Sequence, residues 1–530
     1  MGEGIGRVFF LKDEVGFQPL SNHQGLVVKL LESWREGDEP LALSPKTKER
    51  LLLAARYHDD GKRFTFHIVP DGKGGLTYSF RGHRFRVAQA VQDPYAQALI
   101  RGHHDYSTRE VVNLAADFLE EGLGHRFPED LFLLMMADQL EAELAVRLWQ
   151  RRAGEVRPFV EFDLLPDGEG GFLLDPWPFR VDEVALDFLV YFHPYRGEEA
   201  KVVEGWGRAL VGALEEGKVP EAFREEKRRV RLRPWAAAAR KADDPEAFYA
   251  RFGLKPTPFQ REVFKVAEGD PAHLLLAPTG TGKTEAAAFP ALARGERLVF
   301  VLPTRSLVDD LEGRFRRYLK ILAQEEGRPK ALVVDTGHRQ ARFRFSPDGQ
   351  EEATKERHLY HADVILTTLD KLLYRYFGYA EGVKSYTFPR RIHDRRTLFV
   401  FDEVHLYEAT AWVNFRHLIA SLYKAGVRFL VMSATMPGTY REELLLEGTL
   451  EHPAAKRPSR VLRYMPQGNP MEIIQSHRGK RVLVVLEEVK EAAELYKRLK
   501  GEGVFLYHGR LAEGQRRRVF GKGKRRGKAQ

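Results

Sequence analysis

The sequence predicts a multidomain chain: an all-α N-terminal domain followed by α/β lobes with parallel sheets, of which the second is incomplete. With 530 residues, the chain exceeds what one hydrophobic core usually serves. Up to about residue 155, apolar residues recur at intervals of three and four, which is typical of helices. After Pro256, short runs of Val, Leu and Ile alternate with helical stretches, which is typical of a parallel sheet covered on both faces.

The N-terminal part is predicted to be helical, and the spacing is clearest at 46–57, 84–98, 111–121 and 129–149. Pro-Asp-Gly-Glu-Gly-Gly at 166–171 predicts a hairpin turn, and further helical segments extend to about Gly217. A basic stretch near 224–234 ends in Pro234 and is interpreted as a linker. The predicted boundaries are an N-terminal domain at 1–222, a basic linker at 223–256, a first lobe at 257–455 and a partial second lobe at 456–530.

Composition narrows the classes of function. Lys and Arg number 84 against 75 Asp and Glu, which gives a net charge of +9, and basic residues cluster at 227–233 and 516–530. Such clusters attract a phosphate backbone, although solvated tails also carry them. The chain has no cysteine, so it has no disulfide or thiolate site, and any metal must be held by His, Asp and Glu. No apolar run reaches the roughly 18 residues of a membrane span, and we expect a cytoplasmic protein.

Six strands are predicted after Pro256, at 273–277, 297–302, 330–335, 363–367, 397–401 and 429–433. Helical stretches separate them, which supports the prediction of a parallel sheet. A second series begins with predicted strands at 481–486 and 503–507. These two strands are the basis for predicting a partial second lobe.

The segment Ala-Pro-Thr-Gly-Thr-Gly-Lys-Thr follows the first predicted strand and is expected to open a helix. Glycines in such a loop let backbone N–H groups curl around phosphate oxygens. Lys283 would reach the β and γ phosphates, and the Thr284 hydroxyl would hold Mg²⁺. The segment therefore predicts an ATP site, whose loop residues are Thr279, Gly280, Thr281 and Gly282.

Asp402 and Glu403 end the predicted strand at 397–401. An Asp-Glu pair after an apolar strand is common by itself, but here a phosphate loop precedes it. The Asp402 carboxylate can hold Mg²⁺ through water opposite Thr284, and Glu403 can polarise the attacking water. Glu403 is therefore predicted to be catalytic in ATP hydrolysis.

Other polar residues occupy positions that a nucleic-acid motor would use. Gln260 stands where its amide could read the adenine edge. Ser433 and Thr435 follow a strand, where hydroxyl groups can sense the γ-phosphate. The residues expected to grip nucleic-acid phosphates are Thr304, Arg305, Thr367 and Thr368.

Taken in order, these motifs resemble those of the superfamily 2 helicases from Gln260 to Thr435. The resemblance implies two RecA-like lobes with ATP and nucleic acid in the clefts between them. A plain ATPase switch would not need the residues that grip a strand. The expected cofactor of this part is ATP with Mg²⁺.

Histidines and aspartates form a second pattern in the N-terminal part. His58-Asp59 ends a predicted helix and Asp138 lies within another, while His103 and His104 are adjacent. Their order resembles that of the HD phosphohydrolases. The resemblance implies one metal held by His23, His58, Asp59 and Asp138. It implies a second metal, with Asp59 bridging, held by His83, His103 and His104.

Two such cations would clamp the attacking and leaving oxygens of a phosphodiester. An imidazole-rich set of ligands favours Mn, Fe, Co or Ni over Mg alone. Lys62, one turn after Asp59, could stabilise charge on the phosphorane, so Asp59 and Lys62 are predicted to be catalytic. His67 and His125 fit no ligand position and are expected to be surface residues.

An HD domain followed by a superfamily 2 core resembles the CRISPR-associated helicase–nucleases of type I systems. The matching motifs are His-Asp-x-Gly-Lys at 58–62, His103-His104, Asp-Glu-Val-His at 402–405 and Tyr-His-Gly-Arg at 507–510. The resemblance implies a single-stranded DNA nuclease fed by an ATP-driven translocase that moves 3′ to 5′. It also implies recruitment by an RNA-guided surveillance complex at an R-loop. We expect a monomer.

The predicted second lobe departs from this family. After Tyr-His-Gly-Arg, the family continues through a Gly/Asp motif and an Arg-rich motif that completes the ATP site. Neither fits between Gln515 and Gln530. We expect the chain to bind ATP but hydrolyse it poorly, whether it is a fragment or a natural form completed by another polypeptide.

Two other functions stay open. The HD domain could be a nucleotide or phosphomonoester hydrolase in other nucleic-acid metabolism, but a one-metal site would not use the His103-His104 pair. Alternatively, the chain is a recruitment module whose inactive motor only binds nucleic acid and a partner. Metal analysis with a comparison of single-stranded DNA and free nucleotides as substrates would separate these hypotheses.

Overall fold

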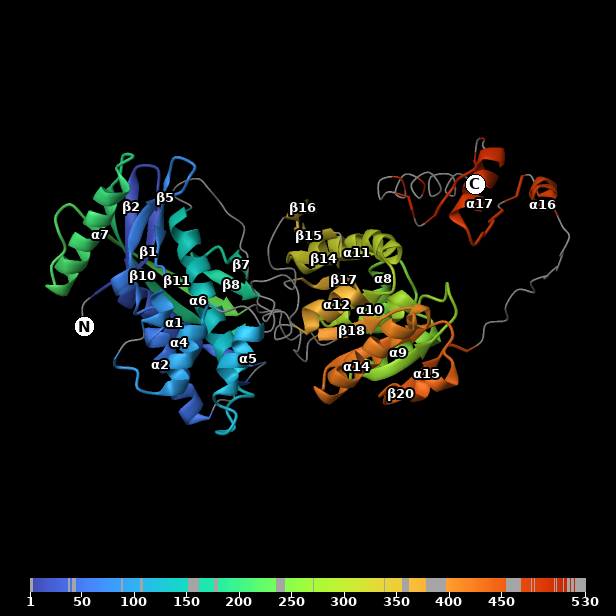
Figure 1. Ribbon diagram of the computed structural model, residues 1–530, viewed down its shortest axis with the longest axis horizontal. Coiled ribbons are helices and arrows are strands. Elements are labelled where there is room, and N and C mark those ends of the chain that lie inside the picture. The colour runs from blue at the N-terminus through green and yellow to red at the C-terminus, as the bar shows by residue number, and fades with distance from the viewer. Residues whose placement is uncertain are drawn as a thin grey trace. The chain divides into compact units, whose positions relative to one another are not determined.

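Figure 1 shows the computed structural model of the chain. It describes residues 3–36, 39–40, 44–86, 89–104, 108–150, 162–175, 180–234, 244–269, 271–337, 339–354, 362–377, 397–453, 469–477, 479–480, 482–499, 501, 503–508, 510–511, 515 and 519. The chain divides into two compact units, Met1–Ala454 and Ala455–Gln530. None of the described helices is long and apolar enough to cross a membrane.

A six-stranded sheet frames the N-terminal part, in the order β1-β2-β10-β11-β8-β7. Its longest strands bury alternate residues such as Leu186, Phe188 and Val190. The prediction of an all-α N-terminal domain is therefore wrong. The hairpin turn predicted at 166–171 does join two of its strands, β7 and β8, but the partners of β10 lie far away in the chain and give no local signal. The strands are β1 (Ile5–Phe10), β2 (Glu14–Pro19), β7 (Asp163–Pro166), β8 (Phe172–Asp175), β10 (Val184–Pro194) and β11 (Arg224–Pro234).

Two small sheets accompany this one. The first joins β3 (Trp34–Glu36), β4 (Glu39–Pro40) and β9 (Arg180–Val181), and the second joins β5 (His67–Pro70) and β6 (Leu76–Ser79).

The predicted basic linker is also contradicted at its beginning. Arg224–Pro234 is the strand β11, which pairs antiparallel with β10 from Phe192↔Arg224 to Val184↔Leu232. Val230 and Leu232 are buried, whereas Arg229 is exposed and pairs with Asp187 at 2.7 Å. The basic cluster is thus the solvated face of a strand. The N-terminal domain consequently extends at least to Pro234.

Most of the N-terminal helices share one apolar core with the sheet, and the helix at Ala200–Glu215 packs on strands of the sheet in a second core. Helix α1 contacts β10, α2 and α6. The predicted helix at 84–98 begins instead at Pro94, because the Asp93 side chain accepts a hydrogen bond from Ala96 N at 2.8 Å and caps the helix there. The helices are α1 (Leu20–Glu32), α2 (Pro45–Tyr57), α3 (Lys62–Thr65), η1 (His83–Phe85, a 3-10 helix), α4 (Pro94–Gly102), α5 (Thr108–Ala116), α6 (Phe127–Gln150) and α7 (Ala200–Glu215).

The second large sheet has the order β16-β15-β14-β17-β13-β18-β19-β12-β20, and its central strands run parallel. Alternate residues of β13 enter two separate apolar cores: Leu298 and Phe300 lie in one, and Val299 and Val301 in the other. Both faces are therefore covered, which confirms the α/β prediction for this part of the chain. The strands are β12 (Ala272–Leu276), β13 (Arg297–Leu302), β14 (Lys330–Thr336), β15 (Arg339–Phe345), β16 (Glu351–Thr354), β17 (Val364–Thr368), β18 (Thr397–Phe401), β19 (Arg428–Ser433) and β20 (Gly448–Glu451).

The helices of this part lie before or between the strands of the sheet in sequence (Figure 1). They are α8 (Pro245–Ala250), α9 (Pro258–Val266), α10 (Lys283–Ala293), α11 (Arg305–Glu326), α12 (Leu369–Tyr376), η4 (Val404–Leu406), α14 (Ala409–Lys424) and α15 (Gly438–Glu442).

In the unit Ala455–Gln530, the structure describes the helices α16 (Pro470–Ser476) and α17 (Val489–Leu499). The described residues of 481–486 and 503–507 form no strand, so these two predictions are wrong. A strand of a parallel sheet is stable only beside its neighbours. Leu483 and Val485 accordingly stay 87% and 80% exposed.

Candidate metal centre and nucleotide site

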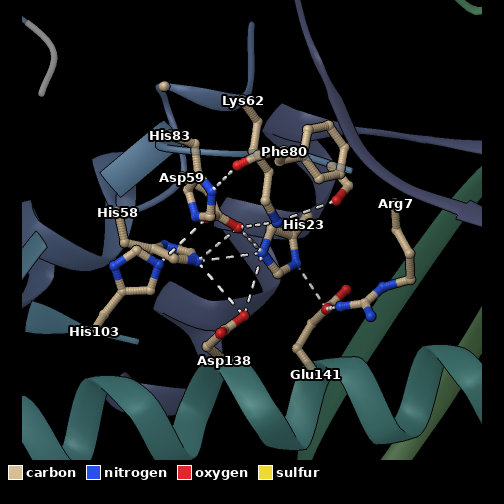
Figure 2. Close-up of polar contacts among 12 residues, drawn as sticks. Arg7, His23, His58, Asp59, Lys62, Phe80, His83, His103, Asp138 and Glu141 are labelled. Atoms are coloured by element: carbon tan, nitrogen blue, oxygen red, sulfur yellow. Dashed lines mark hydrogen bonds and ion pairs between the residues drawn. The ribbon is translucent and has the colours of Figure 1, made fainter. Parts of the chain in front are cut away.

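Seven side chains predicted to bind metal come together in the N-terminal part, and all of them except His104 are labelled in Figure 2. They form two groups, in each of which the ligand atoms lie within 4.8 Å of one another, and Asp59 belongs to both. The first group, called group 1 below, is His23, His58, Asp59 and Asp138. The second, called group 2, is Asp59, His83, His103 and His104.

The ends of helices position most of these residues. Helix α2 ends at Tyr57 and delivers His58 and Asp59, while α4 ends at Gly102 and delivers His103. Gly61 allows η1 to approach this loop, because a Cβ at position 61 would lie 2.0 Å from the carbonyl oxygen of His83. The close approach brings group 2 to the end of α2.

The orientation of each of four imidazole rings is fixed by a hydrogen bond from its Nδ1 atom. The Nδ1 atoms of three donate to backbone carbonyls of the preceding turn: His58 to Ala55 at 2.8 Å, His83 to Phe80 at 2.7 Å and His103 to Ile100 at 2.5 Å. With Nδ1 engaged, Nε2 of each ring faces Asp59, as Figure 2 shows. The distances from Nε2 to a carboxylate oxygen of Asp59 are 2.9 Å for His23, 3.3 Å for His58, 3.1 Å for His83 and 3.4 Å for His103.

By themselves, the described side chains of this arrangement leave buried polar atoms that lack hydrogen-bond partners. Nε2 of His23 lies 3.2 Å from Nε2 of His58, so two lone pairs face each other when both Nδ1 atoms carry the protons. Asp59 Oδ1 and His103 Nε2 are buried without a hydrogen-bond partner among the described residues. Buried polar atoms normally have partners. Imidazole and carboxylate ligands at this spacing suit divalent transition metals.

Electrostatics differ between the two groups. Burial opposes a charge on His58, but the Asp59 and Asp138 carboxylates together outweigh it and raise the pKa of His58 to about 10. Burial and the neighbouring His103 lower the pKa of His104 to about 2. Burial also disfavours ionised Asp59, yet Lys62 and His58 hold the pKa of Asp59 well below its ordinary value. His58 of group 1 therefore holds a proton much more readily than His104 of group 2.

Glu141 is a site residue that the sequence analysis missed. It lies on α6 one turn after Asp138, and its Oε2 accepts a hydrogen bond from His23 Nδ1 at 2.7 Å (Figure 2). Arg7 donates to the same oxygen at 2.9 Å, and Gln18 donates to Oε1 at 2.8 Å. The Asp-x-x-Glu spacing in a predicted helix puts both carboxylates on one face and could have identified it.

Lys62 lies beside the metal groups, whereas the two histidines that fit no ligand position lie outside them. The Lys62 ammonium group pairs with Asp59 and lies 5.0 Å from the centroid of the Phe80 ring. His67 and His125 are exposed and belong to neither group.

The phosphate loop joins β12 to α10. Gly280 and Gly282 have φ angles of 82° and 80°, a region that favours glycine. Thr281 Oγ1 donates to the Pro278 carbonyl at 2.7 Å, Thr279 is exposed, and Thr284 lies in the first turn of α10. The loop is thus built from backbone conformations that leave N–H groups at a helix N-terminus.

The Gln260 side chain is engaged by the protein. Its Nε2 donates to the Gly282 carbonyl at 3.1 Å, and its Oε1 accepts from Thr257 N at 2.8 Å in a capping box. Gln260 therefore contacts the backbone of the phosphate loop directly.

Lys283 and the Asp402-Glu403 pair meet across this site. Lys283 Nζ lies 3.1 Å from Glu403 Oε1, and Glu403 is the one described non-glycine residue with a positive φ, 50°. Burial and the adjacent Glu403 raise the pKa of Asp402 to about 6. A carboxylate whose charge is disfavoured by its surroundings gains from a cation beside it.

The residues assigned to coupling lie at strand ends. His405 Nδ1 contacts Ser433 Oγ at 2.9 Å, and the Ser433 hydroxyl in turn donates to the Thr435 carbonyl. Thr367 Oγ1 donates to the Asp335 carbonyl at 2.7 Å. Thr304 and Arg305 are exposed where α11 begins, and Thr368 precedes α12.

Residues 257–444 match the DEAD/DEAH box helicase family. The CRISPR-associated helicase Cas3 of Thermoproteus tenax is 27% identical over 256 residues, which cover 44% of this chain and 42% of the relative. The CRISPR-associated nuclease/helicase Cas3 of Methanothermobacter thermautotrophicus is 24% identical over 434 residues, or 76% of this chain and 47% of the relative. The chain is related to the CRISPR-associated Cas3 helicases.

The Cas3 relationship is not confined to the helicase domain. A match over 76% of the chain is longer than residues 257–530, so it extends into the N-terminal part. The chain spans less than half the length of these two Cas3 relatives. Among solved structures, the DUF1998 helicase MrfA is similar with a TM-score of 0.38 and 17% identity, covering 51% of this chain and 43% of that one. A DEAD/DEAH helicase domain uses ATP with Mg²⁺.

Proposed function

We propose that the chain is a metal-dependent single-stranded DNA nuclease coupled to an ATP-dependent helicase. The observation that carries the proposal is the convergence of groups 1 and 2 on Asp59 in a chain that also contains a DEAD/DEAH helicase domain. One Cas3 relative is itself described as a nuclease/helicase. By that similarity, the protein would act in CRISPR interference after an RNA-guided surveillance complex has opened an R-loop, and it would move 3′ to 5′.

The residues of the nuclease site would have separate roles. Groups 1 and 2 would each hold one divalent cation (Mn, Fe, Co or Ni), and these ions would supply an activated water and charge stabilisation. Asp59 would belong to both sites. The Lys62 ammonium group, already beside Asp59, would stabilise negative charge on the phosphoryl oxygens.

A polymeric substrate is favoured over a free nucleotide by the surface beside these groups. Phe64 and Phe85 are 64% and 65% exposed, and each stands two residues after a side chain that contacts Asp59. The Arg84 guanidinium lies 4.7 Å from the centroid of the Phe85 ring, and Arg86 is exposed. Exposed aromatic rings with flanking cations are typical of surfaces that stack the bases of single strands.

In the helicase domain, Lys283 would contact the phosphates of ATP, and Thr284 with Asp402 would hold Mg²⁺. Glu403 would orient the attacking water once the nucleotide draws Lys283 away. Ser433 and Thr435, linked to Glu403 by His405, would transmit the state of the γ-phosphate. Thr304, Arg305, Thr367 and Thr368 would contact the strand.

The test is the substitution Asp59→Ala, measured as Mn²⁺-dependent cleavage of single-stranded DNA. We expect cleavage to be abolished, because both groups lose their shared carboxylate, while ATP binding is retained. Unchanged cleavage would refute the assignment of the site. If the wild-type chain cleaves no DNA but hydrolyses free nucleotides in a reaction that Asp59→Ala abolishes, the function of the metal groups is that of a nucleotide hydrolase.

A further inference from the structure

Groups 1 and 2 differ in the acceptors to which the Nδ1 atoms of their imidazoles donate. In group 2, His83 and His103 rest on backbone carbonyls. In group 1, His58 does the same, but His23 donates instead to the carboxylate of Glu141. Among the described Nδ1 contacts of the four oriented rings, this is the one made to a carboxylate.

Glu141 is built into the core. Its side chain is fully buried, and hydrogen bonds from His23, Arg7 and Gln18 fix both of its oxygens. A buried carboxylate is costly unless it is paired, and Arg7 supplies the opposite charge at 2.9 Å. Its three donors come from two strands and a helix, so Glu141 is fixed in place behind His23.

A carboxylate that accepts the Nδ1 proton of a histidine makes the opposite Nε2 atom a stronger ligand and fixes its direction. Backbone carbonyls fix direction but bring no net charge. Group 1 also contains two carboxylates, Asp59 and Asp138, whereas group 2 contains only the shared Asp59. Both differences favour a cation in group 1.

We propose that Glu141 is a positioning residue which, acting through His23, makes group 1 the tighter metal site, so that the two sites fill in order. This inference rests on the proposed function only in that it requires groups 1 and 2 to bind divalent cations. A loosely held second ion would make the nuclease depend on the free metal concentration.

The helix α6 offers a matched control in Asp130. Asp130 is also buried and hydrogen-bonded, to Tyr95 at 2.8 Å and to Arg126 at 3.1 Å, but it belongs to neither metal group. Its substitution removes a buried carboxylate from the same helix without touching an imidazole of the site. Any effect that depends only on the stability of α6 will appear in both variants.

The experiment is a calorimetric titration of the metal-free full chain with Mn²⁺, accompanied by circular dichroism of each variant. For the wild type we expect two binding phases. Glu141→Leu should weaken the tight phase by on the order of 10–100-fold and leave the weak phase in place. Glu141→Gln should weaken it less, because an amide oxygen still accepts the Nδ1 proton but carries no charge. Asp130→Asn should leave both phases unchanged.

The outcomes separate the inference from the proposed function. Two phases in the wild type with no change in Glu141→Gln and Glu141→Leu would overturn the inference alone. Equal losses in Asp130→Asn and Glu141→Leu would overturn it too, because the effect would then be structural. No Mn²⁺ binding by the wild type would overturn both. If Glu141→Leu does not fold, the nearly isosteric Glu141→Gln decides.

Discussion

The two candidate sites of this chain are built in opposite ways. The nucleotide site is mainly one contiguous strand–loop–helix, from β12 to α10, to which Asp402 and Glu403 are added from a neighbouring part of the same sheet. The metal groups are assembled from α1, α6, η1 and the ends of α2 and α4, and their shared residue is Asp59. A site of the first kind depends on local backbone conformation, whereas a site of the second kind depends on how the whole domain packs.

The largest effect that tests this contrast is expected from Lys283→Ala. Loss of the cationic side chain should reduce ATP turnover by on the order of 10²–10³-fold, as for removal of one charge-stabilising donor from an active site. Mn²⁺ binding by the N-terminal groups should not change. The measurements are ATP hydrolysis and Mn²⁺ titration, and Lys265→Ala, at an exposed lysine of the same domain, is the control. A loss of Mn²⁺ binding would show that the two sites are not independent.

A substitution in the buried core at β11 should destabilise the N-terminal domain that carries the metal groups and leave the nucleotide site intact. Leu232 is fully buried, and Leu232→Ala should cost about 2–5 kcal/mol of stability. Arg231→Ala, at the neighbouring exposed position, should change stability by less than about 0.5 kcal/mol. Hydrogen exchange in peptides from β10 and α1 measures both, and nucleotide binding should be retained. Equal tolerance of the two substitutions would mean that 224–234 is not a strand of this sheet in solution.

The smallest effect concerns the exposed aromatic rings beside the metal groups. Phe85→Ala should weaken binding of single-stranded DNA by about 1–3 kcal/mol, or roughly 5- to 150-fold in Kd. Phe85→Trp should retain affinity because it keeps an aromatic face. Fluorescence anisotropy with a labelled oligonucleotide measures both, and Leu119→Ala removes an exposed apolar side chain elsewhere as a control. Equal affinity of Phe85→Ala and the wild type would exclude base stacking at this position.

Much of the helicase domain was predictable from the sequence. Six predicted strands correspond to β12, β13, β14, β17, β18 and β19, because each is a short apolar run buried on both faces. The phosphate loop could be recognised because the residues that create it are adjacent. Beyond the hairpin at 166–171, the N-terminal sheet could not be recognised, since β10 pairs with β2 and β11 at long sequence separation and β11 is rich in charge.

The sequence by itself determined which residue types were available: seven His and Asp side chains for cations, and a Gly-rich loop for phosphates. Only the tertiary structure decided how the imidazoles are oriented and that Glu141 stands behind His23, with Arg7 behind Glu141. The physical reason is the sequence separation between the residues that interact. Local motifs act over a few residues of backbone, whereas Arg7, His23 and Glu141 meet only when a strand and two helices pack around one core.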